Sequence, residues 1–323
     1  MFNSSFAREM TDYLELRTAV LSASSASNDR RVLLLLDQYL VLSGFQGKEL
    51  TEDILSAWSK TLSGKSKTVK EKLAVVRGFG KYLNTLGHQS FLPTLPKVKS
   101  DYIPYIFSDE EIVSIFHYAD NLTPQNPRSC SSFFQLKIPM ALRILYSCGT
   151  RLQETMSLQR KDVDFKNRTL FLKKTKFSKE RVIPVHESLI AVMERYCLTL
   201  GIMHEPEAFL FPGRKEGSHY TTRQMDSWFS EILKLADIDQ RERDCHERGA
   251  CLHCFRHLFV LKSMQQLEAA GHSVDMNDLL LPTYLGHECL LDTDKYMRFS
   301  GGQVAGAIEA FESCLLYTSP SPR

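Results

Sequence analysis

Apolar residues recur every three or four positions through four segments of the first 92 residues, the spacing of one face of an α-helix. The segments are residues 4–21, 28–44, 51–62 and 67–87. Thr51 stands where an N-cap is expected, and Gly87 follows the last segment, where helices commonly end. The pattern therefore predicts an all-helical domain over residues 1–92.

The pattern changes twice along the rest of the chain. Residues 93–107 carry three prolines and little periodicity, which predicts a linker. Residues 169–185 partly alternate between apolar and polar positions around a polar turn, which favours a β-hairpin. Helical spacing covers residues 108–120, 134–149, 186–200, 221–238 and the stretch after 250. We expect a second domain over residues 108–313 of the α+β class, mainly α-helical with a small antiparallel β-sheet.

Two helix boundaries in this second domain can be assigned from capping residues. Ser108 and Glu111 have the spacing of a capping box. Gly149 can end a helix in the left-handed conformation. Thr150 and Gln153 then have the spacing of a capping box for the next helix, which would begin directly after that glycine.

Composition excludes several classes of protein. The chain has 323 residues, 43% hydrophobic and 24% charged, which is typical of a globular protein with room for two domains. It contains no run of 18 apolar residues, so we expect no membrane span. The first residues lack the basic-then-apolar layout of a secretory signal, and eight scattered cysteines favour free thiols. We expect a cytoplasmic protein.

The last ten residues, 314–323, break from the sequence before them. Their sequence, CLLYTSPSPR, has no periodicity and resembles translated sequencing-adapter DNA. We expect the native C-terminus to differ beyond about residue 313, and these ten residues do not enter the interpretation.

Charge is distributed unevenly, although the formal net charge is only +2. From Lys60 to Lys99 there are nine basic residues and one acidic residue, Glu71. Such a run is either a solvated helix face or a surface that follows the phosphates of a nucleic acid. The candidate residues for such a nucleic-acid surface are Lys60, Lys65, Lys67, Lys70, Arg77 and Lys81, together with Lys179 in the hairpin.

Two segments carry candidate anion ligands. Arg151 is expected in the first turn of its helix, where its guanidinium and the free backbone N–H groups would face an anion; the alternative is a simple ion pair with Glu154. On a helix, His253, Arg256 and His257 share one face, and a histidine and an arginine one turn apart can hold two oxygens of one phosphate. The alternative is a helix face without a role.

A zinc site is a competing interpretation of the second segment. The candidate ligands are Cys245, His246, Cys251, His253 and Cys254. Structural zinc sites favour two close ligand pairs separated by a loop, and this spacing lacks a matching second pair. We therefore expect no metal.

The last candidate segment contains Gly286, His287 and Tyr296. Gly286 can end a helix with His287 at its tip, and a following helix would carry Tyr296 near its start. The tyrosine is either a core aromatic residue or a nucleophile. Because a phenol ionises only near pH ~10, a nucleophilic tyrosine needs nearby cations or a base.

Taken in order, these segments resemble the tyrosine recombinase (phage integrase) family, in its two-domain, Xer-like form. The family pattern G-x-R-x-x-E is matched by residues 149–154, and K-x-x-K-x-R-x-x-P by residues 176–184. The pattern H-x-x-R-H is matched by residues 253–257, and L-G-H by residues 285–287, with the nucleophile nine residues after that histidine at Tyr296. The resemblance covers roughly residues 5–313. Cysteines around His253 depart from the usual family sequence.

The resemblance implies a helical, SAM-like core-binding domain at the N-terminus and a catalytic domain after it. It implies a DNA strand-exchange enzyme that uses neither cofactor nor metal, and that acts as a homotetramer on two double-stranded DNA sites. It also implies association with the nucleoid of a prokaryotic or mobile-element host. The implied catalytic residues are Arg151, Lys176, His253, Arg256, His287 and the nucleophile Tyr296. The alternatives are a type IB topoisomerase-like enzyme and a catalytically silent DNA-binding regulator.

Overall fold

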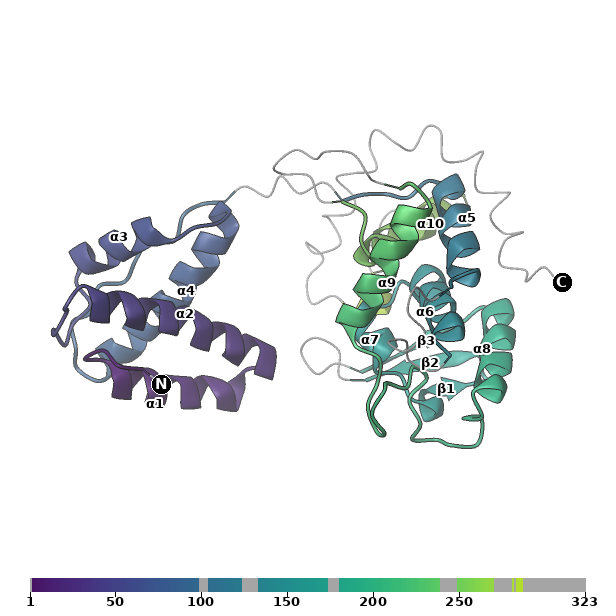
Figure 1. Cartoon of the computed structure of the whole chain (residues 1–323), viewed down its shortest axis with the longest axis horizontal. Coiled ribbons are helices and arrows are strands. Elements are labelled where there is room, and N and C mark those ends of the chain that lie inside the picture. The colour runs from purple at the N-terminus through teal and green to yellow at the C-terminus, as the bar shows by residue number, and fades with distance from the viewer. Residues whose placement is uncertain are drawn as a thin grey trace. The chain divides into compact units, whose positions relative to one another are not determined.

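The chain divides into two compact units, Met1–Ser100 and Asp101–Arg323 (Figure 1). The computed structural model describes residues 2–98, 104–123, 133–173, 180–238, 249–269, 281 and 283–286. The division between the units falls inside residues 93–107, the segment for which a linker is predicted.

The first unit consists of helices, as the sequence predicts. They are α1 (Ala7–Val20), α2 (Ala23–Leu42), α3 (Glu52–Thr61) and α4 (Ser66–Thr85). Helix α2 begins five residues earlier than its apolar periodicity suggests, because the Ser22 hydroxyl accepts the N–H of Ser25 and caps it there. Thr51 caps α3 through the N–H of Ile54, as expected.

The core of the first unit is apolar and aromatic. Trp58, Phe6, Phe79 and Leu36 are almost completely buried. Phe6 and Phe79 meet edge to face with their ring centres 6.1 Å apart, a favoured arrangement for aromatic pairs. One continuous cluster therefore joins the N-terminal segment to α4.

The second unit is mainly helical. Its helices are α5 (Asp109–Asp120), α6 (Phe134–Cys148), α7 (Leu152–Met156), α8 (Glu187–Thr199), α9 (Thr222–Leu235) and α10 (His253–Ala269), with a 3₁₀ turn η1 (Arg160–Asp162). The predicted capping box of α5 is present: the N–H of Glu111 donates to the Ser108 hydroxyl, and the N–H of Ser108 donates to Oε2 of Glu111. Helix α6 contacts α5, α7, α8 and α10 and forms the centre of the core.

A three-stranded antiparallel sheet completes this unit. Its strands β1 (Val163–Asp164), β2 (Thr169–Leu172) and β3 (Arg181–Pro184) lie in the order β1-β2-β3. Strands β2 and β3 pair with Leu170 opposite Ile183, and both side chains are buried. The two strands of the predicted hairpin are confirmed, whereas the two-residue strand β1 is too short to show alternation in sequence.

The mainly α fold with a small antiparallel sheet is therefore as expected. Among the described residues, no helix is both long and apolar enough to cross a membrane.

Candidate active site

Arg151 lies at the junction of α6 and α7. Gly149 ends α6 in the left-handed conformation, with φ of 56°, as predicted. A Cβ atom at this position would stand 2.4 Å from Cδ1 of Phe259, so both the backbone conformation and the space require glycine. This turn brings Arg151 to the start of α7.

The predicted capping box of α7 is wrong by one residue. Helix α7 begins at Leu152, and Arg151 occupies the N-cap with φ −75° and ψ 146° rather than the first turn. Oε2 of Glu154, not the side chain of Gln153, reaches back to the N-cap and accepts the Arg151 N–H at 3.0 Å. A carboxylate makes a stronger charge-assisted hydrogen bond than an amide. The hydroxyl of the buried Thr150 instead contacts that of Thr155 at 2.6 Å.

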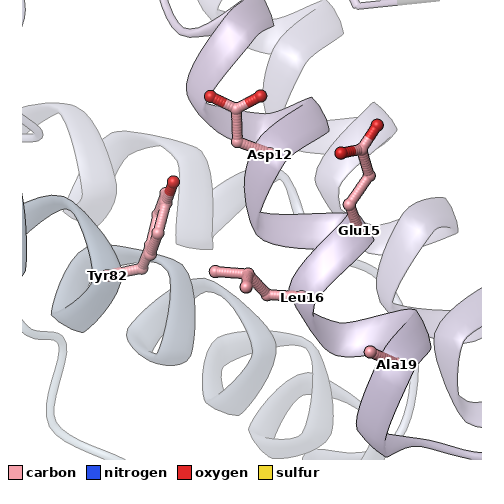
Figure 2. A pocket seen from close by; sticks show the side chains of 5 residues that line it. All are labelled: Asp12, Glu15, Leu16, Ala19 and Tyr82. Atoms are coloured by element: carbon pink, nitrogen blue, oxygen red, sulfur yellow. The ribbon is translucent and has the colours of Figure 1, made fainter.

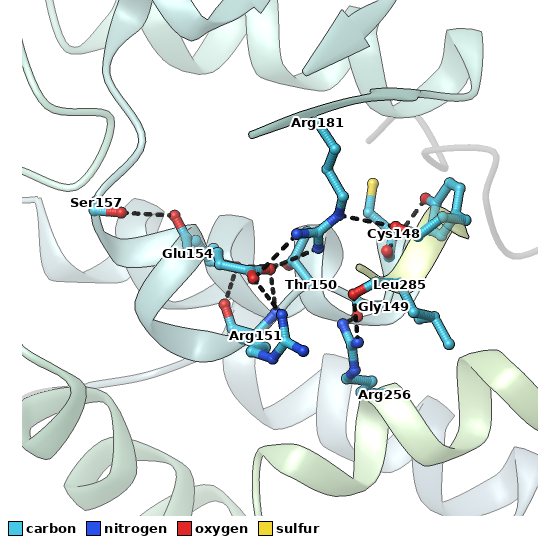
Figure 3. A network of polar contacts seen from close by, with 11 residues as sticks. Cys148, Gly149, Thr150, Arg151, Glu154, Ser157, Arg181, Arg256 and Leu285 are labelled. Atoms are coloured by element: carbon cyan, nitrogen blue, oxygen red, sulfur yellow. Dashed lines mark hydrogen bonds and ion pairs between the residues drawn. The ribbon is translucent and has the colours of Figure 1, made fainter. Parts of the chain in front are cut away.

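Glu154 is the centre of an ion-pair network (Figure 3). Its side chain is 4% exposed, and its Oε1 accepts from Nη1 of Arg151 at 2.7 Å. Arg181, at the start of β3, donates Nη1 to Oε1 at 3.2 Å and Nη2 to Oε2 at 2.8 Å. Burial alone would raise the pKa of Glu154, but the hydrogen bonds and charge of Arg181, together with the Arg151 contacts, outweigh it and lower that pKa. The carboxylate therefore stays ionised between two guanidinium groups.

Two arginines also hold the segment just before His287. Nε of Arg181 donates to the carbonyl of Tyr284 at 2.8 Å, and Nη2 of Arg256 donates to the adjacent carbonyl of Leu285 at 2.8 Å. Nη1 of Arg256 donates to the carbonyl of Gly149 at 2.7 Å. Figure 3 shows these contacts in one cluster, although the residues come from four parts of the chain.

Gly286 packs against this cluster. Its φ is 66°, the left-handed conformation expected of a helix-ending glycine, and a Cβ atom here would lie 3.1 Å from Nη1 of Arg181. A side chain at this position would therefore press on the guanidinium that binds Glu154. Gly149 and Gly286 thus share one property: each lets the main chain approach a neighbouring side chain, that of Phe259 at Gly149 and that of Arg181 at Gly286.

The start of α10 supplies the histidines. His253 is exposed and meets His257 edge to face, with ring centres 4.8 Å apart. Arg256 and His257 are buried, at 1% and 8% exposure. Burial, followed by the charges of His253 and Arg256, lowers the pKa of His257 to about 3, so this ring is neutral. The three residues of the predicted shared face therefore differ in solvent exposure: His253 is exposed, whereas Arg256 and His257 are buried.

The structure places part of the predicted catalytic set. Arg151 and Arg256 are linked through the backbone of Gly149, and His253 begins the helix that carries Arg256. Lys176, Lys179, His287 and Tyr296 lie outside the described residues. Arg181 has no separate role among the residues predicted from the sequence, although its position in the K-x-x-K-x-R pattern is the signal that marks it.

The zinc interpretation gains no support from the described residues. Within the ranges that the structure describes, no group of three or more histidine, cysteine, aspartate or glutamate side chains could hold a metal ion. Cys245 and His246 lie outside those ranges.

The candidate DNA-binding residues of the first unit differ in exposure. Lys60, Lys65, Lys67 and Lys81 are exposed, and Lys70 is half-buried. Arg77 is also half-buried, and its Nη1 donates to the carbonyl of Pro93 at 2.7 Å. The lysines therefore present their charge to solvent, while Arg77 also fixes the chain that leaves α4.

The first unit carries an acidic hollow as well. It lies between α1 and α4 and is lined by Asp12, Glu15, Leu16, Ala19 and Tyr82 (Figure 2). Burial, and then the charges of Asp12 and Glu9, raise the pKa of Tyr82. Two carboxylates at its rim make this hollow unsuitable for phosphate, in contrast to the lysines on α4.

The model of the phage integrase family matches residues 106–299, more than half of the chain. The chain belongs to the phage integrase family. It is a tyrosine-type site-specific recombinase, and the resemblance inferred from its sequence is confirmed.

Individual relatives of the recombinase agree with this assignment. This chain is 28% identical over 243 residues to the putative integrase/recombinase y4rE of Sinorhizobium fredii. The alignment covers 73% of this chain and 74% of the relative. The chain is also 28% identical over 276 residues to the tyrosine recombinase XerC of Staphylococcus saprophyticus, which covers 84% of this chain and 83% of the relative.

Solved structures show the same fold. The XerH site-specific recombinase bound to palindromic difH substrate superposes with a TM-score of 0.66 at 18% identity, over 89% of this chain and 80% of that one. The Tn1549 transposon integrase in complex with transposon right end DNA gives 0.63 at 17% identity, over 95% of this chain and 98% of that one. The predicted fold class is confirmed by these matches.

Proposed function

We propose that this recombinase cleaves and rejoins double-stranded DNA through Tyr296. The phenolate oxygen attacks a backbone phosphorus, an O–P bond to Tyr296 forms, and the bond to the 5′-oxygen breaks. The products are a 3′-phosphotyrosine and a free 5′-hydroxyl. Because the phosphodiester is exchanged and not hydrolysed, rejoining needs no ATP.

The observation that carries this proposal is the arginine cluster. Arg151 and Arg181 flank the carboxylate of Glu154, and Arg256 holds the nearby carbonyl of Gly149. Three guanidinium groups and one carboxylate leave the cluster with a net positive charge. A site of this sign favours the additional negative charge of a phosphoryl-transfer transition state. Arg151 is the partly exposed member, with 26% of its side chain accessible, so it is suited to contact a non-bridging oxygen.

Arg256 acts in two ways in this proposal. Two of its donors hold the Gly149 and Leu285 carbonyls, which fixes the segments carrying Arg151 and His287. In this proposal the guanidinium of Arg256 also contacts a non-bridging oxygen of the phosphate.

The other roles follow the family pattern. Lys176 protonates the departing 5′-oxygen, His253 assists proton transfer, and His287 donates a hydrogen bond to the phosphate. His253 is exposed at the start of α10, as a residue that contacts DNA must be. Lys60, Lys65, Lys67, Lys70, Lys81, Arg77 and Lys179 bind backbone phosphates.

Assembly is part of the same proposal. Four subunits on two DNA sites exchange one pair of strands to form a Holliday junction, and a second pair resolves it. The choice of substrate is supported by the XerH structure, bound to palindromic difH substrate, and by the Tn1549 integrase structure, in complex with transposon right end DNA. We place this activity in the cytoplasm, at the nucleoid.

Covalent trapping tests the proposal. The protein is incubated, in the presence of a chelator, with a pool of randomised duplexes nicked so that the short 5′-hydroxyl fragment diffuses away after cleavage. We expect a DNA–protein species that survives denaturation, with one enriched sequence in the recovered DNA. The Tyr296→Phe variant should bind the same sequence without forming this species.

Two outcomes would replace the proposal. Sequence-specific binding without trapping would make the protein a DNA-binding regulator. Trapping accompanied by relaxation of supercoiled plasmids, but without strand exchange between two recovered sites, would make it a type IB topoisomerase-like enzyme.

A further inference from the structure

Two cysteines flank His253 at the start of α10. The Sγ atoms of Cys251 and Cys254 are 3.6 Å apart, and the backbone N–H of Cys251 donates to Sγ of Cys254 at 3.4 Å. Cys251 is half-buried, and Cys254 is completely buried. One sulfur is therefore accessible to a small reagent, and the other stands behind it in contact.

We propose that Cys251 and Cys254 form a modification site that reacts with a peroxide and closes to a reversible disulfide beside His253. This site is separate from the phosphate-binding cluster, since neither sulfur belongs to the Arg151, Glu154, Arg181 and Arg256 network.

The chemistry uses one peroxide and the two thiols. The Cys251 thiolate attacks a peroxide oxygen, the O–O bond breaks, and the products are a Cys251 sulfenic acid and water, or an alcohol from an organic peroxide. Sγ of Cys254 then attacks the sulfenic sulfur, the S–O bond breaks, and a second molecule leaves as water. The two sulfurs together lose two electrons, which the peroxide receives.

The geometry assigns these two roles. Cys251 meets the oxidant because it is the accessible sulfur. Cys254 resolves the sulfenic acid, since its Sγ is already in contact with Cys251, and a disulfide bond of about 2.05 Å requires an approach of roughly 1.5 Å. The hydrogen bond with Cys251 and burial both raise the pKa of Cys254, which keeps it a thiol until its partner has reacted.

Two other cysteines serve as internal references. Cys148 and Cys197 are buried, and burial raises their pKa values to about 12 and about 11. A buried thiol held in its protonated form is a poor nucleophile. We expect both to resist the same peroxide treatment.

Closure of the disulfide should affect catalysis, and this consequence rests on the proposed function. His253 lies between the two cysteines, and Arg256 follows Cys254 within the next turn of α10. Drawing the two sulfurs together changes the first turn of the helix that carries both side chains. We expect the oxidised protein to cleave the nicked substrate several-fold more slowly, and a dithiol reductant to restore the rate.

Peptide mass mapping tests the site without relying on activity. Trypsin cuts after Arg248 and Arg256, so both cysteines fall in one peptide, residues 249–256. After peroxide treatment of the folded full-length protein, unfolding and alkylation, we expect this peptide to be two hydrogens lighter and unalkylated. The peptides with Cys148 (residues 144–151) and Cys197 (residues 196–214) should be alkylated in full.

Variants and a metal control keep the outcomes distinct. Cys251→Ser should abolish both the disulfide and the peroxide sensitivity of cleavage, and Cys254→Ala provides a second variant that should leave Cys251 as a trapped sulfenic acid.

Full alkylation of residues 249–256 after peroxide, or a disulfide from either cysteine to a different one, would overturn the site. Protection that a chelator removes, without a change of mass, would indicate zinc instead. A disulfide that forms without changing cleavage would retain the modification site and remove its effect on His253.

Discussion

The two units of this recombinase bury charge in different ways. In the first unit, the carboxylate of Asp37 accepts the backbone N–H groups of Asn3 and Ser4, and that of Asp29 pairs with Arg17 at 2.9 Å. Asp37 fastens the start of the chain, and the Arg17 side chain is 39% exposed. These buried charges each fix one local feature of a helical core.

In the second unit, buried charges join segments that are far apart in the sequence. Arg181 reaches both Glu154 and the carbonyl of Tyr284, while Arg256 reaches Gly149 and Leu285. The site is thus assembled by charge and by main-chain carbonyls, not by apolar packing alone. Disrupting a buried charge should cost stability in either unit, but only in the second should it also disassemble the site.

Each unit contains one tryptophan, which allows the comparison to be measured. Trp58 lies in the core of the first unit, and Trp228 stacks on Phe134 in the second. The variants Trp58→Phe and Trp228→Phe leave a fluorescence signal from one unit at a time. Urea titrations on these two backgrounds report the unfolding of each unit separately.

The largest effect is expected from Glu154→Gln. Removing this carboxylate leaves Arg151 and Arg181 without their anion, and breaking a buried ion pair by removing one partner costs about 3–5 kcal/mol. The Trp228 signal should show this loss, and covalent trapping should fall with it. Asp29→Asn is the matched control in the first unit. Because its partner Arg17 is partly exposed, it should cost about 1 kcal/mol or less and leave trapping unchanged.

Arg181→Lys should have the next largest effect. A lysine keeps the charge but cannot donate to both oxygens of Glu154 and to Tyr284 together, and each hydrogen bond to a charged group contributes about 1.5–3 kcal/mol. We expect slower cleavage at saturating DNA with nearly unchanged binding. A loss of binding equal to the loss of rate would contradict a positioning role. Arg168→Lys is the control, since Arg168 pairs with Glu187 at the surface.

Through His257, the stability of the second unit should depend on pH in a way that the stability of the first unit does not. The folded pKa of this histidine, about 3, lies below its ordinary 6.5, so the unfolded chain takes up the proton first as the pH falls. The contribution of the neutral His257 ring to the free energy of unfolding is complete above pH 6.5. It is lost progressively toward pH 3, at about 1.4 kcal/mol per pH unit. By pH 5 the second unit should have lost about 2 kcal/mol through this residue.

The His257→Gln variant identifies the origin of that loss. In this variant, the free energy of unfolding measured with Trp228 should depend less on pH between pH 7 and pH 5. The urea titration measured with Trp58 should stay the same. An equally steep dependence in the variant would assign the effect to other groups.

Local features of the fold could be predicted from the sequence. Apolar periodicity gave the helices and both strands of the hairpin, and the Ser108 capping box and the left-handed Gly149 depend only on neighbouring residues. The predicted N-cap of α7, Thr150, is wrong because Glu154 accepts the backbone N–H of Arg151 and fixes the N-cap one residue later. That carboxylate is held in turn by Arg181, which no local pattern reveals.

The candidate site was predicted only in part, for the same reason. Motif spacing singled out Arg151, His253 and Arg256. It could not show that Arg256 donates two hydrogen bonds to carbonyls 107 and 29 residues away. Such contacts depend on the folded arrangement of distant segments. The catalytic roles of all six residues stay predictions: Arg151, Lys176, His253, Arg256, His287 and Tyr296.

The smallest effect is expected at the lysine surface of the first unit. Lys67 is exposed on α4, so Lys67→Ala should change the stability of that unit by less than about 0.5 kcal/mol. If this lysine contacts a phosphate, the slope of log K against log salt should become shallower by about 0.9. Glu15→Gln, at the acidic hollow beside α1, is the control and should leave the slope unchanged. An unchanged slope for Lys67→Ala, measured on the recovered DNA site, would make this lysine part of a solvated helix face.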